Sequence, residues 1–216
     1  MHRARPDGPT PSSDPDPLPV NAPTPVNGQI RLVPSDPAWP GLFAREAVRI
    51  RAALGERALQ IEHIGSTSVP GLLAKPIIDI LLVVTDCADE ASYLPDLAAA
   101  GYRLRIREPD PAAGATFTGD EPHRVCKGPN TDLNLHIYSA GSGEIERYLL
   151  MRDRLRAVPS ERDLYARVKV ELAAQHWATV QAYADAKGAV VEAIIIRARE
   201  AARYSGVQKY GHRHGP

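Results

Sequence analysis

The sequence lacks a charge excess of either sign, a cysteine framework and any long apolar run. Its 26 basic and 26 acidic side chains balance, so we expect no general attraction to nucleic acid or to an anionic membrane. Two cysteines, Cys87 and Cys126, are too few for a disulfide framework or a cysteine zinc site. No run approaches the roughly 20 apolar residues of a membrane span, and the N-terminus lacks the apolar core of a signal peptide. We therefore expect a cytoplasmic protein with no nucleic-acid or membrane partner.

The composition predicts one globular domain between two tails. Apolar residues make up 44% of the 216 residues, which is enough to supply a core. Residues 1–28 contain eight prolines among small polar residues, so we expect a disordered, Pro-rich tail, with a docking peptide as the alternative. Residues 204–216 are also polar and are predicted to form a flexible tail. The domain then spans 29–203, with an α/β part over 29–140 and a helical part over 144–202.

Hydrophobic periodicity predicts the order of strands and helices within this domain. Apolar and β-branched segments predict strands near 29–33, 59–64, 77–84, 102–107, 122–127 and 132–139. Segments with a helical repeat of apolar residues predict helices near 38–54, 88–100, 144–157, 160–176 and 179–202. Strands and helices are mixed first, and a purely helical part follows. The expected fold class is α+β: a mixed β-sheet with flanking helices and a C-terminal helical segment.

One carboxylate lies inside an apolar strand that follows a glycine-serine turn and a connection with proline and glycine. The first strand runs into Gly65 and Ser66, and the next one, Ile-Ile-Asp-Ile-Leu-Leu-Val-Val, carries Asp79 near its start. A buried charge is costly unless it is paired or binds a metal, so Asp79 predicts an ion pair or a cation site. Gly65 allows the chain to approach a ligand closely, while Ser66 and the backbone N–H groups from Thr67 onward can bind phosphate oxygens. Asp79 would then hold Mg²⁺ on those phosphates.

The strand near 132–139 is a second candidate for chemistry. Alternation places Asp132, Asn134, His136 and Tyr138 on one face, which is too polar for an ordinary core. If this strand neighbours Asp79, His136 or Asp132 completes a metal or substrate site. An edge strand with one solvated face explains the pattern equally well. Both interpretations stay open from the sequence.

The glycine-serine segment resembles the GrpB family, a branch of the DNA polymerase β-like nucleotidyltransferase superfamily. The resemblance rests on His-Ile-Gly-Ser-Thr-Ser-Val-Pro-Gly-Leu over 63–72, followed by Ala-Lys-Pro-Ile-Ile-Asp over 74–79. Upstream, Val33-Pro34 and Asp36 to Phe43 with Glu46 resemble the family's opening. Downstream, Leu-His-Ile-Tyr over 135–138 and Met-Arg-Asp-Arg-Leu-Arg over 151–156 fall in family-like order. The resemblance covers roughly residues 29 to 200.

This resemblance implies a nucleotidyltransferase-like sheet and a function. The expected reaction is Mg²⁺-dependent (or Mn²⁺-dependent) transfer of a nucleoside monophosphate from a nucleoside triphosphate to an unidentified small acceptor. Asp79 and His136 are the expected catalytic residues and metal ligands, with His136 as ligand or general base. The expected phosphate-binding residues are Gly65, Ser66, Thr67, Lys75, Arg152 and Lys169. For Lys75 the alternative is a solvated loop lysine, and for Arg152 it is an ion-paired surface helix.

The chain departs from working members of the superfamily at one position. Those enzymes usually carry a second acid two residues after the first, and this chain has Leu81 there. Glu62, Asp132 or His136 compensates, or the site holds one metal, or it has lost catalysis and kept binding. Two other functions therefore stay open. One is a non-catalytic module for a nucleotide or a coenzyme A-related ligand, since some relatives are fused to dephospho-coenzyme A kinase. The other is a metal-dependent phosphoryl or acyl transfer that needs only Asp79 and His136.

Two further patterns concern buried polar groups. His63 alternates with an apolar neighbour and is interpreted as a hydrogen-bonded interior histidine rather than a catalytic one. Tyr165 and Lys169 are four residues apart, as are Tyr183 and Lys187. At that spacing the tyrosine can pack inward while the lysine reaches a polar cleft.

Overall fold

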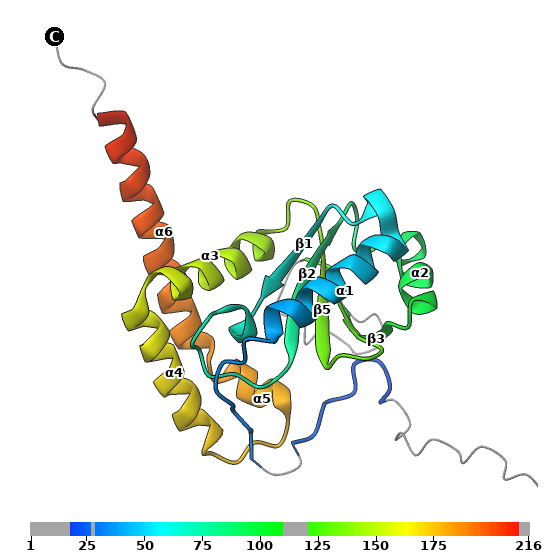
Figure 1. The fold of residues 1–216 in the computed structure, drawn as a ribbon, viewed down its shortest axis with the longest axis horizontal. Coiled ribbons are helices and arrows are strands. Elements are labelled where there is room, and N and C mark those ends of the chain that lie inside the picture. Colours follow the sequence, from blue (N-terminus) through cyan, green and yellow to red (C-terminus); the bar gives the residue numbers. More distant parts are fainter. Residues whose placement is uncertain (1–17, 27–28, 110–120, 212–216) are drawn as a thin grey trace, which may run out of the picture.

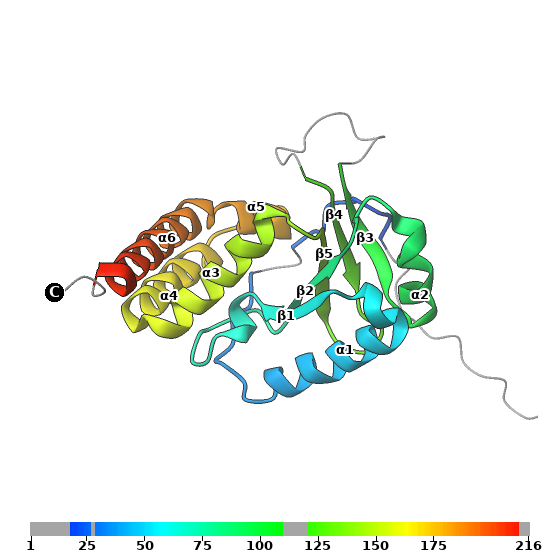
Figure 2. The same ribbon diagram turned by 90° about the horizontal axis from the view of Figure 1, so that it is seen from above.

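A five-stranded mixed sheet forms the centre of the protein, with helices over one face and a helical segment beside it that packs against part of the other (Figures 1 and 2). The computed structural model describes residues 18–26, 29–109 and 121–211. The strands are β1 (Gln60–Ile64), β2 (Ile78–Val84), β3 (Arg103–Glu108), β4 (His123–Lys127) and β5 (Leu133–Ser139). Their order across the sheet is β1-β2-β5-β4-β3. β2 and β5 run parallel, and the other neighbouring pairs run antiparallel. The predicted α+β fold class is confirmed.

One face of the sheet packs against α1 (Trp39–Leu54) and α2 (Leu94–Ala99), and this layer is the main core. Alternate residues of β2 and β5 point into it, because side chains of a strand alternate between its two faces. Its fully or almost fully buried members from these strands are Ile78, Ile80, Leu82, Val84, Leu133, Leu135 and Ile137. The residues between them, Asp79 and His136 included, therefore lie on the opposite face. This face carries the candidate site.

The opposite face meets a helical segment made of α3 (Gly143–Ala157), α4 (Pro159–Ala173), α5 (Val180–Asp185) and α6 (Gly188–Gly211). Ser142 caps α3 by accepting a hydrogen bond from the backbone N–H of Glu144 at 3.2 Å, and Thr179 caps α5 in the same way. Tyr148 and its apolar neighbours on α3 pack against Leu81 and Tyr138 of the sheet. α3 thus joins the helical segment to the sheet and leaves the polar part of the sheet face open beside it.

Three predicted elements differ from the structure. No strand forms near 29–33, where Val33 makes a single β-bridge with Ala74. The helix predicted near 88–100 shortens to the 3₁₀ turn Glu90–Ser92 and α2, because Pro95 favours a helix start at this point. The helix predicted near 179–202 is divided into α5 and α6 just before Gly188, a residue of low helix propensity. α6 continues to Gly211, so most of the tail predicted over 204–216 is helical, and residues 212–216 lie outside the described residues.

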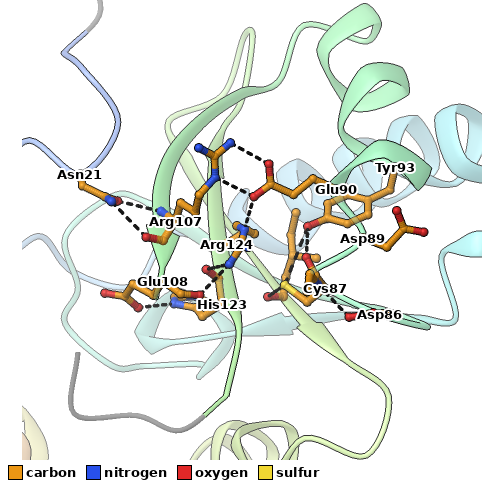
Figure 3. A network of polar contacts seen from close by, with 12 residues as sticks. Asn21, Asp86, Cys87, Asp89, Glu90, Tyr93, Arg107, Glu108, His123 and Arg124 are labelled. Atoms are coloured by element: carbon orange, nitrogen blue, oxygen red, sulfur yellow. Dashed lines mark hydrogen bonds and ion pairs between the residues drawn. The ribbon is translucent and has the colours of Figure 1, made fainter. Parts of the chain in front are cut away.

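Part of the predicted N-terminal tail, residues 18–26, is bound to the domain, and we call it the N-terminal strap. The backbone N–H of Asn21 donates to the Arg105 carbonyl at 2.9 Å, and the Asn21 side chain exchanges two hydrogen bonds with the backbone of Arg107 (Figure 3). Pro25 forms a β-bridge with Thr179 at the start of α5. The prediction of disorder is therefore wrong for residues 18–26, because proline-rich chain still offers carbonyl acceptors. Residues 1–17 and 27–28 lie outside the described residues.

A polar network fixes the edge of the sheet next to the strap. Arg107 donates to both carboxylate oxygens of Glu90 at 2.7 and 2.6 Å, and the buried Arg124 donates to one of them at 2.5 Å (Figure 3). Cys87 lies nearby as a buried thiol whose pKa is raised by burial, so it is a structural residue rather than a nucleophile.

Within the described ranges, no helix has the length and apolar character needed to cross a membrane.

Candidate active site

The glycine-serine turn lies directly against the Asp79 carboxylate. β1 ends at Ile64, which pairs with Asp79 across the β1–β2 ladder, and the chain then turns at Gly65 with φ of 66°. A Cβ atom at this position would lie 2.3 Å from Asp79 Oδ2. Only glycine therefore fits, for both its left-handed backbone and its contact with the carboxylate. The sharp turn expected at Gly65 is present, and the group that it approaches is the Asp79 carboxylate. Close approach to a ligand stays a prediction.

Two residues of β5 orient Asp79. Asn134 is its direct neighbour in the parallel β2–β5 pair and donates from Nδ2 to Asp79 Oδ1 at 2.8 Å. His136 Nε2 lies 3.7 Å from the same oxygen. The predicted neighbourhood of these two strands is confirmed. Burial by itself would raise the pKa of Asp79, but His136, Asn134 and the charge of Lys75 outweigh it and hold the pKa below its ordinary value. Asp79 is therefore ionised at neutral pH.

His136 continues into a row of polar groups that the sequence analysis did not single out. His136 Nδ1 lies 3.2 Å from Nε2 of His123, and His123 Nδ1 lies 2.9 Å from a Glu108 carboxylate oxygen. The two imidazole rings are stacked, with centroids 5.4 Å apart and planes 3° apart. Burial lowers the pKa of His123. The signal for this residue is that His123 shares a strand face with Val125, the residue opposite His136, and it becomes readable only once the β4–β5 pairing is known.

The acids that the sequence analysis proposed as extra metal ligands are engaged elsewhere. Glu62 forms an ion pair with Arg152 at 2.8 Å. Asp132 is 63% exposed and lies 3.5 Å from the ammonium of Lys127. Leu81 does lie on the same face as Asp79 but is fully buried in an apolar cluster. Neither acid therefore replaces the second carboxylate next to Asp79.

This donor set limits the metal that the site can hold. Among the described residues, no group of three or more His, Cys, Asp or Glu side chains is placed to bind a metal ion. Asp79 with His136 is a two-residue set, and Mg²⁺ prefers oxygen over imidazole nitrogen. Mg²⁺ is commonly bound by one or two carboxylates together with substrate phosphates. The residues therefore fit a single Mg²⁺ shared between Asp79 and a bound phosphate group, and they do not fit a site that holds two metals by protein ligands.

Three lysines from different elements surround the same site. Lys169 of α4 is only 2% exposed, and its ammonium donates to Ser66 Oγ at 3.1 Å and to the Leu73 carbonyl. Burial, with a smaller contribution from the charge of Lys187, lowers the pKa of Lys169 to about 7. Burial, and then the charge of Lys75, lowers the pKa of Lys187 to about 8. The pKa of Lys75 is also lowered, mainly by burial.

These lysines have aromatic neighbours but no acid partner. The Tyr183 ring centroid lies 5.6 Å from the Lys75 ammonium and 4.7 Å from that of Lys187, while Lys169 lies 5.0 Å from the Tyr165 centroid. The tyrosines are buried, as predicted from the four-residue spacing. Of the carboxylates in the described part of the chain, none comes within 4 Å of these three ammonium groups. The three ammonium groups thus have no ion-pair partner among the described residues, and Asp79 acts on Lys75 and Lys187 only from a greater distance.

A cavity of about 400 Å³ brings the predicted site residues together. Its lining includes Gly65, Ser66, Thr67, Lys75, Asp79, His136 and Lys169 from the sequence analysis, together with Asn134, Lys127 and Lys187. Thr24 of the N-terminal strap and Arg105 of β3 contribute another part of the wall. The interpretation of Asp79 and His136 as neighbours of a phosphate-binding turn is therefore consistent with a real concave site.

Arg152 lies outside this cavity. It lines a neighbouring cavity of about 280 Å³ and forms ion pairs with Glu62 at 2.8 Å and Asp153 at 2.7 Å. Its charge is already compensated, which matches the ion-paired alternative rather than a phosphate contact. His63 is an interior histidine, as predicted: its Nε2 lies 3.1 Å from Thr67 Oγ1, and burial lowers its pKa to about 4.

Comparison with known families matches the chain to the GrpB protein family over residues 29–197. UPF0157 protein BH1888 of Halalkalibacterium halodurans is 60% identical over 174 residues, which cover 81% of this chain and 85% of that protein. The crystal structure of conserved protein GrpB from Enterococcus faecalis has a TM-score of 0.64 at 32% identity, and covers 79% of this chain and 98% of that chain. Both matches span most of both partners.

A further similarity is to part of a larger protein. A dephospho-CoA kinase of Mycolicibacterium paratuberculosis is 36% identical over 157 residues. The match covers 65% of this chain but 39% of that protein.

Proposed function

The chain belongs to the GrpB family, and we propose that it is a nucleotidyltransferase that binds a nucleoside triphosphate in the lysine-lined cavity and transfers its nucleoside monophosphate to a small acceptor. The observation that supports this most strongly is the group of three lysines without acid partners around Ser66 and Asp79. A triphosphate supplies the negative charge that this cavity lacks. The similarity of residues 63–79 to the superfamily motif adds the reaction type.

The lysines and the turn would hold the two outer phosphates. Lys169 already contacts Ser66 Oγ, so an oxygen bound by one of them is within reach of the other. The ammonium groups of Lys75 and Lys187 both lie over the Tyr183 ring, at 5.6 and 4.7 Å from its centroid. Charge-assisted hydrogen bonds are about twice as strong as neutral ones, and they strengthen further where water is excluded. Binding in this cavity therefore depends on the lysines rather than on Arg152.

Asp79 would hold a single divalent cation against the phosphates. Its lowered pKa keeps it ionised, and its Oδ2 faces the Gly65 turn. When bound, Mg²⁺ would supply neutralisation of phosphate charge next to the turn. The protein's own contribution is to fix the carboxylate, through the Asn134 hydrogen bond, in one orientation.

His136 would act as the general base. Its Nε2 lies on the Asp79 side and its Nδ1 on the His123 side, so the ring is oriented by neighbours at both ends. It takes the proton of an acceptor hydroxyl as that oxygen forms a bond to the α-phosphorus. The bond between the α-phosphorus and the bridging oxygen breaks at the same centre, and pyrophosphate leaves bound to the lysines.

A second candidate function, a binding module without turnover, is favoured by Leu81. This residue is buried among apolar side chains, so the usual second acid is missing and no other acid replaces it. In this case the similarity to a dephospho-CoA kinase points to a coenzyme A-related phosphate compound as the ligand. The lysine-lined cavity would serve either function.

ATP titrations test the lysine-lined cavity, and a turnover assay then separates the two candidate functions. ATP with Mg²⁺ should bind the parent protein, and Lys187→Met should weaken binding by roughly tenfold or more, because one charge-assisted contact is worth about 1.5–3 kcal/mol. Arg167→Met is the control that removes a charge outside the cavity. Arg167 of α4 is exposed and does not contribute to the cavity lining. Equal loss of affinity in both variants, or in neither, would contradict the lysine-lined site.

Turnover is measured as pyrophosphate release from ATP in the presence of a mixture of small hydroxyl compounds. The enzyme hypothesis predicts release that Asp79→Asn abolishes. ATP binding without any pyrophosphate would instead select the binding module.

A further inference from the structure

A second cavity adjoins the lysine-lined cavity of about 400 Å³, which is called the phosphate cavity from here on. Its volume is about 280 Å³, and it shares Gly65, Ser66, Asp79, Tyr148 and Lys187 with the larger cavity. From these shared residues it extends toward α3 and α6, whereas the phosphate cavity extends toward β4, α5 and the N-terminal strap. The nucleotide chemistry proposed above leaves this second cavity without an occupant.

The second cavity has apolar side chains of α3 and α6 in its walls, beside charged ones. Met151 and Leu155 contribute from α3, and Val191 and Ile195 face them from α6. Tyr148 supplies an aromatic ring at the junction of the two cavities. Pockets of this kind bind the apolar face of a small molecule, and a few polar groups set its orientation.

The two arginines that line this cavity are already paired. Arg147 forms ion pairs with Glu144 at 2.9 Å and with Glu192 at 3.0 Å. Arg152 is paired with two acids, as described above. The unpaired Lys187 belongs to the residues shared with the phosphate cavity, where the triphosphate would engage it. A charged ligand between α3 and α6 would have to displace an existing partner of an arginine, so this part of the cavity favours a neutral molecule.

We propose that this cavity binds the acceptor, and that the acceptor is a neutral hydroxyl compound with an apolar face about the size of one aromatic ring. This inference rests on the proposed nucleotidyltransferase function. Attacking and leaving oxygens lie roughly in line in phosphoryl transfer, so the acceptor must approach the α-phosphorus from the side away from the pyrophosphate. With the pyrophosphate on the lysines, the acceptor has to come from another side of Asp79. The cavity between α3 and α6 reaches Asp79 and Ser66 from such a side.

The transfer step then uses both cavities. The acceptor oxygen, projecting from the second cavity toward Asp79, forms the new bond to the α-phosphorus. The bond to the pyrophosphate oxygen breaks, the pyrophosphate stays on the lysines, and the hydroxyl proton passes to His136. Filling the second cavity should therefore block the acceptor without disturbing the triphosphate.

The methionine content allows a direct measurement. The sequence has two methionines, Met1 and Met151, so selective ¹³C-methyl labelling places one of two signals inside this cavity. Benzyl alcohol is a suitable test compound, because it is neutral, carries a hydroxyl and contains one aromatic ring. We expect it to shift the Met151 methyl signal in a saturable way in the full-length protein, with ATP and Mg²⁺ present. An unmoved Met151 signal would overturn the proposal.

Two phenylalanine substitutions on α6 form a matched pair. Val191→Phe adds an aromatic ring to the cavity wall, and Ile196→Phe adds the same ring at a position that is 52% exposed. Val191→Phe should weaken benzyl alcohol binding by roughly tenfold or more, since small changes in an apolar pocket have effects of this size, and it should leave ATP affinity unchanged. Ile196→Phe should bind benzyl alcohol like the parent. Equal affinity in the parent and in Val191→Phe would overturn the proposal.

Failure of the acceptor site and failure of the proposed function are distinguishable. If Val191→Phe unfolds, Met151→Phe makes the same test. Binding is then measured from the ¹⁹F line width of 4-fluorobenzyl alcohol, which should broaden less with Met151→Phe than with the parent protein. A parent protein that binds ATP but whose Met151 signal does not respond to benzyl alcohol rejects the second cavity alone. Absence of ATP binding to the parent protein rejects the proposed function, whatever the Met151 signal shows.

Discussion

Replacing Lys169 by Met should stabilise the ligand-free protein at pH 7 while weakening its binding of ATP. The lysine is 2% exposed and has no acid partner among the described residues, so its charge is costly in the folded state. Methionine has a similar length and no charge, and it keeps the contact with the Tyr165 ring. The substitution therefore removes the charge with little change in packing.

The size of the effect follows from the pKa of Lys169. It falls from 10.5 to about 7, and each pKa unit corresponds to about 1.4 kcal/mol, so burying the charge costs up to roughly 4 kcal/mol at pH 7. The variant loses the hydrogen bonds to Ser66 and to the Leu73 carbonyl, which costs about 1–3 kcal/mol. A net gain of about 1–3 kcal/mol in the free energy of unfolding is expected at pH 7.

The gain should depend on pH with a definite sign. The folded-state pKa is depressed, so between pH 7 and 10 the unfolded chain binds more protons at Lys169 than the folded protein does. The stability of the parent therefore rises with pH in this window, while the variant lacks this contribution. The advantage of Lys169→Met should shrink by about 1.4 kcal/mol for each pH unit, and reverse at about pH 8–9.

Urea unfolding of both proteins at pH 7, 8 and 9, with ATP titrations at pH 7, measures these effects. We expect the stability difference to fall with pH and the ATP affinity of Lys169→Met to drop roughly tenfold or more. A variant that is less stable by the same amount at every pH, with parental ATP affinity, would refute the reasoning. Lys169 would then be a structural donor to Ser66 and Leu73.

Three further substitutions test other parts of the structure. Gly65→Ala should lower the free energy of unfolding by about 2 kcal/mol or more and abolish ATP binding. Its Cβ would lie 2.3 Å from Asp79 Oδ2, on a backbone in the left-handed region. Thermal melts measure the stability and ATP titrations the binding. Leu81→Asp should destabilise by about 3 kcal/mol or more in urea unfolding rather than create a metal site, since it buries an unpaired charge among apolar side chains, and a Mn²⁺ affinity above the parent's would contradict this. Asn21→Ala should cost about 1–3 kcal/mol by the same measurement, because two side-chain hydrogen bonds to the Arg107 backbone are lost, whereas a disordered tail predicts no change.

Local pattern was enough to predict the elements that carry the site. β2 and β5 are apolar on one face and polar on the other, so their alternation already placed Asp79 and His136 on a shared face once the strands were assumed to be neighbours. Gly65 was readable because a glycine before a serine at a strand end has few structural reasons other than a sharp turn or a close approach.

Long-range packing decided what local pattern could not. His123 is an ordinary strand residue until the antiparallel β4–β5 pairing brings its Nε2 to 3.2 Å from His136. The charge state of Lys169 depends on its burial against Ser66 and Leu73 and on the absence of a described acid within ion-pair distance, neither of which is encoded within a window of sequence. Arg152 shows the reverse case, since its helix position suited a phosphate while its partners Glu62 and Asp153 compensate its charge.

The prediction of disorder for the N-terminal strap was wrong for a related reason. The composition of residues 1–28 as a whole predicts disorder, because it is dominated by proline and small polar residues. Residues 18–26 are fixed by hydrogen bonds to β3 and to the start of α5, and Val26 packs against the cluster of Ile30, Ala173 and Tyr183. These contacts depend on partners that only the folded domain supplies.

Proton uptake on ATP binding tests the central claim most directly, because it reports the lysines themselves. At pH 8, Lys169 and Lys187 with pKa values of about 7 and 8 are in large part neutral in the free protein, and a bound triphosphate should raise both pKa values. Isothermal titration calorimetry at pH 8, in two buffers of different ionisation enthalpy, measures the number of protons taken up. We predict saturable ATP binding with net proton uptake that is reduced in Lys169→Met. Absence of binding, or binding with no proton uptake, would contradict the assignment of this cavity as a triphosphate site.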